Sequence, residues 1–156
     1  MQKTALLAER IREVFLHGTW IANTNYKAVL EATNWEQALR TQGALNSIAA
    51  LTFHVNYYLA GLLSVFRGGK LEISDAFSFD MPPVSGQEEW TGMVAALLDN
   101  AGAFATTIEA MEDSSLDLPF VDPRYGTIAR NIEGVIEHSY YHLGQIVLLT
   151  RLNQLP

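Results

Sequence analysis

The sequence predicts an all-α protein with a single domain over residues 1–156, built as a four-helix bundle with long loops between its helices. Apolar residues recur mainly at helical spacing, and no alternating strands separated by hairpin turns are present. A length of 156 residues suits one hydrophobic core. The composition, 49% hydrophobic and 17% charged, is typical of a folded globular chain rather than a disordered one.

The first long helix is expected from Thr4 to His17, with Gly18 ending it. Its predicted buried stripe consists of Leu7, Ile11, Val14 and Phe15. The less regular stretch that follows, up to Gly43, favours two short helices, at Asn25–Ala32 and Trp35–Thr41. The second of these is expected to begin with a capping box, formed by Asn34 and Gln37.

The second long helix is expected over about Ser47–Arg67, ending where Gly68 and Gly69 permit a left-handed exit. It is apolar on most sides, which predicts a central position. Its small and apolar residues outside the core stripe serve either a dimer interface or packing within one chain: Ala50, Phe53, Tyr57 and Gly61. The following stretch, Gly69–Gln87, contains two prolines and is expected to be a long loop of the kind that often borders a site.

Ser85 and Glu88 fit a capping box that opens a third helix, which is expected to end near Glu112. One face of this helix carries an apolar stripe: Met93, Leu97, Ala101, Phe104, Ile108 and Met111. A connector with two prolines, Asp113–Tyr125, follows. Thr127 is then expected to cap a fourth helix that reaches about Asn153.

Three of the four histidines are candidates for a metal site. His138 and His142 are four residues apart on the predicted fourth helix, so they share a face and are about one turn apart along the axis. His54 lies at the margin of the apolar stripe of the second helix. Two neighbouring helices could bring the three imidazoles together, leaving a fourth coordination position for water. The alternative is that each histidine is a hydrogen-bonded core residue.

Several other classes of protein are disfavoured. The chain has no cysteine, so any metal must be held by His, Asp or Glu. Ser139 stands where the metalloprotease pattern H-E-x-x-H needs its glutamate, and no nucleophile elbow, Walker loop, Rossmann glycine pattern or di-iron pattern is present. The net charge of −7, with scattered basic residues, argues against nucleic-acid binding. Polar residues interrupt the most apolar stretches, and no export signal is seen, so a cytoplasmic protein outside the membrane is expected.

The segment Glu137–Ile146, which reads EHSYYHLGQI, together with SIAALTFH at Ser47–His54, resembles the DinB-like superfamily. The resemblance covers most of the chain, and the H-x-x-x-H-x-G-Q pattern is its most specific part. It implies a four-helix bundle, often a homodimer, in which His54, His138 and His142 hold a divalent metal. Some members of the superfamily transfer low-molecular-weight thiols or isomerise thiol adducts.

The resulting hypothesis is a metal-dependent enzyme that activates a thiol or water at the open position, as a thiol S-transferase or a hydrolase acting on a small molecule. Zinc and nickel are the leading ions, and imidazole also suits iron, manganese and copper. Asn131 and Gln145 are candidates for orienting a ligand or a bound water, although a place on the polar surface of the helix explains both equally well. Trp20 and Tyr58 are candidates for the pocket wall, although packing in the core is favoured for both. The alternatives are a non-catalytic, metal-binding dimeric interaction protein and a binder of a small ligand.

Overall fold

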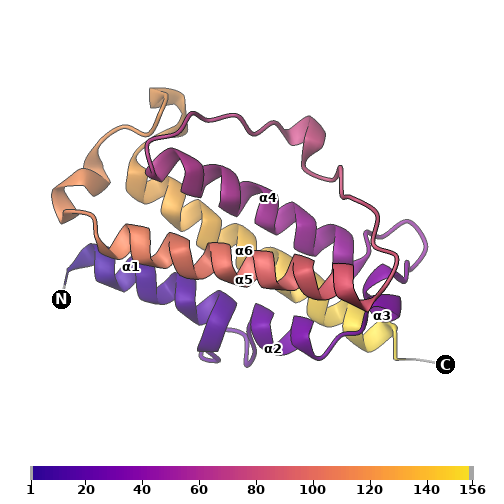
Figure 1. The fold of residues 1–156 in the computed structure, drawn as a ribbon. Helices are drawn as coiled ribbons and strands as arrows, with labels where there is room; N and C mark the ends of the chain where they lie inside the picture. Colours follow the sequence, from indigo (N-terminus) through magenta and orange to yellow (C-terminus); the bar gives the residue numbers. More distant parts are fainter. Residues whose placement is uncertain (1, 155–156) are drawn as a thin grey trace.

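The computed structural model of the chain describes residues 2–154, and these form an all-α fold without a strand (Figure 1). Four long helical segments lie side by side, with α5 packed on α1 and α4, and α6 packed on α4 and α1. Their bounds are α1 Lys3–Arg12, continued by the π-helix η1 Glu13–His17, then α4 Ile48–Phe66, α5 Gln87–Glu109 and α6 Ile128–Leu152. Two short helices precede α4, namely α2 Tyr26–Glu31 and α3 Trp35–Leu39.

The direction of the helices explains the longest loop. In Figure 1, α1 and α6 run one way, whereas α4 and α5 both run the other way. Because α4 and α5 are parallel neighbours, the chain between them, residues 67–86, must return along the length of the bundle. We call this segment the crossover; it contains one 3-10 turn, η2 Asp75–Phe77. The long loop expected at this place is therefore confirmed, and it lies along α4.

The crossover covers part of the α4 face for which the sequence allowed either a dimer interface or packing within one chain. The Tyr57 hydroxyl donates to the Ser74 carbonyl at 3.1 Å and accepts from the Ser74 N–H at 2.9 Å. Gly61 lies against Ile73, since a Cβ at that glycine would come within 2.3 Å of Cγ2 of Ile73. These two positions of α4 are thus used for packing within one chain.

The predicted core is largely the observed one. All four residues of the first stripe are buried, and the middle parts of α4, α5 and α6 each contribute buried apolar residues. Apolar and aromatic residues nearer the helix ends or the crossover are only half-buried: Tyr58, Phe66, Met93, Met111 and Ile128. Trp90 is 1% exposed, and its indole N–H donates to the carbonyl of Thr33 at 2.7 Å, which fixes α5 to the α2–α3 linker.

Helix starts with a strong side-chain cap are confirmed. Asn34 accepts from the N–H of Gln37, whose side chain accepts from the N–H of Asn34 in return. The Thr127 hydroxyl accepts from the N–H of Arg130 at the start of α6. Side-chain oxygens bond the first free N–H groups of a helix in this way, so these sequence signals determine the start of α3 and of α6.

The Ser85 and Glu88 capping box is wrong. The first residue of α5 is Gln87, and Gly86 occupies the N-cap in an extended conformation without a side-chain cap. Ser85 therefore lies one position outside the cap, and its hydroxyl donates to Glu89 Oε1 at 3.0 Å. The helix also ends at Glu109, earlier than expected, because Asp113 turns away in a 3-10 segment and accepts from the N–H groups of Lys3 and Thr4.

Glycine is needed at the ends of two helices for different reasons. Gly68 has φ +90°, so it is the left-handed residue that ends α4, as expected. Gly18 ends the first helical segment, as expected, and its backbone is extended, with φ −86°. The reason for glycine there is space: a Cβ would lie 2.0 Å from Cγ of Glu13, at the end of the π-helical turn.

By length and composition alone, α4 could cross a membrane. In the bundle, nine of its 19 residues are buried. A central helix of a folded core meets the same length and hydropathy test.

Candidate metal centre

Three imidazoles converge between α4 and α6. His54 comes from the middle of α4, and His138 and His142 come from successive turns of α6. Nε2 of His138 lies 3.2 Å from Nε2 of His54 and 3.0 Å from Nε2 of His142. One ring nitrogen from each residue lies within 4.8 Å of the other two. The three histidines are therefore close enough to hold one metal ion, as the helical spacing predicted.

Two of the three nitrogen–nitrogen separations are close to those of tetrahedral coordination. Two nitrogens that are each about 2.05 Å from one zinc ion, at the tetrahedral angle, are about 3.3 Å apart. The two Nε2 separations of 3.0 and 3.2 Å are close to this value.

Two of the rings are held through their other nitrogen. Nδ1 of His142 lies 2.6 Å from Oε1 of Gln145, and Nδ1 of His54 lies 3.3 Å from the carbonyl oxygen of Ser78. A carbonyl oxygen can only accept, so Nδ1 carries the proton in both contacts. In the neutral rings, Nε2 of His54 and of His142 are then unprotonated, and both lone pairs face Nε2 of His138. A proton on Nε2 of His138 can be donated to only one of these two lone pairs, whereas a bound cation would accept the lone pairs of all three Nε2 atoms.

The electrostatics favour neutral rings. Burial, together with the neighbouring His142 and His54, lowers the pKa of His138 to about 4. Burial, followed by the proximity of His142, lowers the pKa of His54, and burial lowers the pKa of His142 although Gln145 opposes this. Neutral imidazole is the form that binds a metal, so the cluster is in its ligand form at neutral pH.

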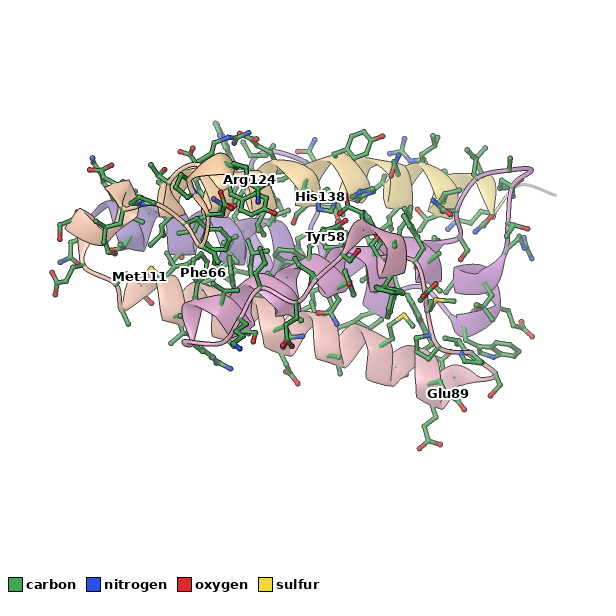
Figure 2. The ribbon with its side chains drawn as sticks, turned by 90° about the horizontal axis from the view of Figure 1, so that it is seen from above. Tyr58, Phe66, Glu89, Met111, Arg124 and His138 are labelled. Atoms are coloured by element: carbon green, nitrogen blue, oxygen red, sulfur yellow. The ribbon has the colours of Figure 1, made fainter. Side chains whose placement is uncertain are left out.

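Aromatic side chains form the wall around His54. The ring of Phe79, in the crossover, stacks on His54 with centroids 4.2 Å apart and planes at 11°. Tyr58 of α4 meets His54 and His138 edge-on, and Figure 2 shows the labelled Tyr58 and His138 next to each other. The Tyr58 hydroxyl donates to Oδ1 of Asp75 at 2.5 Å, which connects the crossover to the site.

A cavity of about 460 Å³ opens beside the histidines. It lies between α4 and the first half of α6, and its wall is mostly apolar with a few polar groups, as in many small-molecule sites. It is lined by His54, Tyr58, Leu62, Tyr125, Arg130, Asn131, Gly134, Val135 and His138. His142, which is 7% exposed, is not among them, so the cavity meets the cluster from the side of His54 and His138.

The other candidate residues are distributed unevenly. Tyr58 and Asn131 line the cavity, and the Asn131 amide donates to the carbonyls of Tyr125 and Thr127 at 2.8 Å. Gln145 contacts His142 directly. Trp20 is not brought to the site: it is 87% exposed and lies in the turn after η1.

The position of Trp20 has a local cause. The N–H of Asn23 donates to the carbonyl of Thr19, and the Asn25 side chain donates to the carbonyl of Gly18. These bonds close the chain into a turn around Trp20, and the side chain points to solvent. Three crossover residues that contact the site were not predicted: Asp75, Ser78 and Phe79. Their only signal in the sequence was that a long loop often borders a site.

Comparison with models of known protein families found no match. A search of curated proteins and a search of solved structures likewise found no match. The evidence for a function therefore comes from the three-histidine geometry and the cavity beside it.

Proposed function

We propose that this protein is a metal-dependent enzyme of the DinB-like type, in which His54, His138 and His142 hold one divalent transition-metal ion. A small-molecule thiol or water takes the open coordination position, as in a thiol S-transferase or a hydrolase. Zinc and nickel are the leading ions, because imidazole nitrogen suits both.

The observation that carries the proposal is the convergence of three neutral imidazoles beside a cavity. Nε2 of His138 lies 3.0 Å from Nε2 of His142 and 3.2 Å from Nε2 of His54. No fourth protein ligand belongs to the cluster in the described range. Structural zinc sites usually fill all four positions with side chains, whereas catalytic sites keep one position for water or substrate. A three-histidine donor set next to an accessible space favours the catalytic class.

Groups around the cluster orient and cover the three histidines. Gln145 and the carbonyl of Ser78 orient His142 and His54 through Nδ1, and Phe79 covers the ring of His54. A divalent ion held by these rings acts as a Lewis acid and lowers the pKa of the thiol or water beside it. The apolar wall at Leu62 and Val135 limits the water that reaches the reacting group.

The alternative, a non-catalytic interaction protein or a simple ligand binder, has less support. Part of the α4 face that an interaction protein would use is covered by the crossover at Tyr57 and Gly61. A homodimer and a cytoplasmic location remain predictions. Light scattering on the purified protein measures the mass and so tests the dimer.

Elemental analysis of the purified protein tests the metal assignment. The expected result is about one transition-metal ion per chain. His54→Ala, His138→Ala and His142→Ala should each lose most of the metal while far-ultraviolet circular dichroism stays helical. His17→Ala is the matched control, because His17 is exposed and lies near Glu9, away from the cluster. Unchanged metal content in all three cluster variants would overturn the proposal.

A further inference from the structure

The charges around the cavity contrast with those of the whole chain. The chain carries a net charge of −7, yet no carboxylate side chain lines the cavity in the part of the chain that the structure describes. The one charged side chain in its wall is Arg130. With a divalent ion on the histidines, the cavity would hold two cationic centres and no anionic wall residue. A space of this kind favours an anionic ligand.

Arg130 is placed to meet such a ligand. It lies eight residues before His138 on α6, a rise of about 12 Å along the helix axis, and both line the same cavity. Its guanidinium is bound to Oε2 of Glu137 at 3.0 Å in an exposed ion pair. Exposed pairs contribute little to stability, so the guanidinium can exchange this carboxylate for one on a ligand at small cost.

Most of the remaining cavity wall is apolar, with polar groups from Tyr58, Tyr125 and Asn131. Leu62, Gly134 and Val135 line the cavity together with Arg130 and His138. A ligand that reaches from Arg130 to the histidines therefore passes an apolar wall. Its middle part should be a short hydrocarbon or a similar uncharged chain.

From these observations we propose that the substrate is a small carboxylate, held at Arg130 by its anionic end while its reacting group lies at the three histidines. This inference rests on the proposed function and adds the substrate class to it. One guanidinium matches the planar, singly charged carboxylate, as its present bond to Glu137 illustrates. A phosphate, with its higher charge, favours more than one cationic side chain, and Arg130 is the single one that lines the cavity among the described residues.

Binding of thiols to the cobalt-loaded protein tests the proposal. The thiolate-to-cobalt charge-transfer absorption reports binding without any need for turnover. The probes are 6-mercaptohexanoate, the neutral 6-mercaptohexan-1-ol and 6-mercaptohexyl phosphate, which share one chain length. The wild-type protein should bind the acid about fivefold more tightly than the alcohol, because a charge-assisted hydrogen bond is added.

Two arginine variants identify the anchor. Arg130→Gln should lose the preference for the acid while its affinity for the alcohol stays unchanged. Arg124→Gln is the matched control, since Arg124 is an exposed arginine paired with Asp122 and does not line the cavity. It should keep the preference.

The outcomes separate this inference from the proposed function. Equal affinity for acid and alcohol in the cobalt-loaded wild type, a preference that survives Arg130→Gln, or tighter binding of the phosphate would overturn the carboxylate assignment alone. Failure of the three histidines to bind cobalt, measured before any thiol is added, would overturn the metal site and the inference together.

Discussion

Nδ1 of His142 lies 2.6 Å from Oε1 of Gln145, the residue three positions further along α6. This bond fixes the ring so that Nε2 faces the Nε2 of His138. Partners that orient a ligating imidazole commonly affect metal affinity as well as ring position. The pair is formed within one helix, so the helical geometry of α6 places both the ligand and its support.

Replacing Gln145 should weaken metal binding without unfolding the protein. Gln145→Ala removes the acceptor, and we expect the metal affinity to fall about 10- to 100-fold. Gln145→Glu keeps an acceptor at the same place and should retain most of the affinity. Competition with a chelator of known affinity measures both. Equal affinities in Gln145→Ala and the wild type would show that the bond has no part in the site.

Phe79 should control access to His54. Its ring stacks on the imidazole at 4.2 Å, so Phe79→Ala exposes the ring, and we expect release of the metal to a chelator to become several times faster. The control is Phe77→Ala, two residues earlier in the crossover, because Phe77 is 58% exposed and has no ring contact with the cluster in the range described. Identical release rates in the two variants would contradict a covering role for Phe79.

The metal-free protein should lose stability as the pH falls from neutral toward 5. Burial and the neighbouring histidines lower the pKa of His138 to about 4, and burial also lowers the pKa values of His54 and His142, whereas an unfolded histidine titrates near 6.5. Below about pH 6.5 the unfolded chain therefore takes up protons that the folded chain does not, and the free energy of unfolding falls. Above this range, these three residues add no pH dependence.

Urea denaturation of the metal-free protein at pH 7.5 and pH 5 measures this effect. The comparison stops at pH 5 because the carboxyls of Asp113, Asp122 and Glu109, whose pKa values are lowered by their hydrogen-bonded partners, contribute only at lower pH. His138→Gln should show a smaller decrease than the wild type. A midpoint that is the same at both pH values in the wild type would be inconsistent with buried neutral rings.

Two glycine substitutions should have opposite effects on stability. Gly18→Ala places a Cβ 2.6 Å from Cα of Glu13, a backbone atom that cannot rotate away, so we expect destabilisation by about 1–3 kcal/mol. Gly92→Ala in α5 meets nothing within 4 Å and should stabilise the protein by about 0.5–1 kcal/mol. Urea unfolding checks both. Equal stability of the two variants would contradict the close packing at the π-helical turn.

The fold was predictable where local signals determine it. The caps at Asn34 and Thr127 and the left-handed Gly68 each act within a few residues, and each is found as expected. The π-helical turn at Glu13–His17 was not predicted, because its apolar pattern resembles that of an α-helix. The path of the crossover depends on the parallel direction of α4 and α5, which no local pattern records.

The site was predictable to the extent that helical spacing positions it. The four-residue interval between His138 and His142, and the marginal position of His54, led to the observed cluster. Ser78 and Phe79 reach His54 from the crossover, and Arg130 shares the cavity through the packing of α6 on α4. These contacts depend on tertiary structure. That the three histidines bind a metal, and that the residues around them support it, stays a prediction.

Anomalous X-ray diffraction from crystals of the metal-loaded protein, collected at the absorption edge of the bound metal, tests the central claim most directly. We expect one anomalous peak per chain, about 2.0–2.1 Å from one ring nitrogen each of His54, His138 and His142. A peak held by other residues, or no peak in crystals soaked with zinc or nickel, would contradict the account.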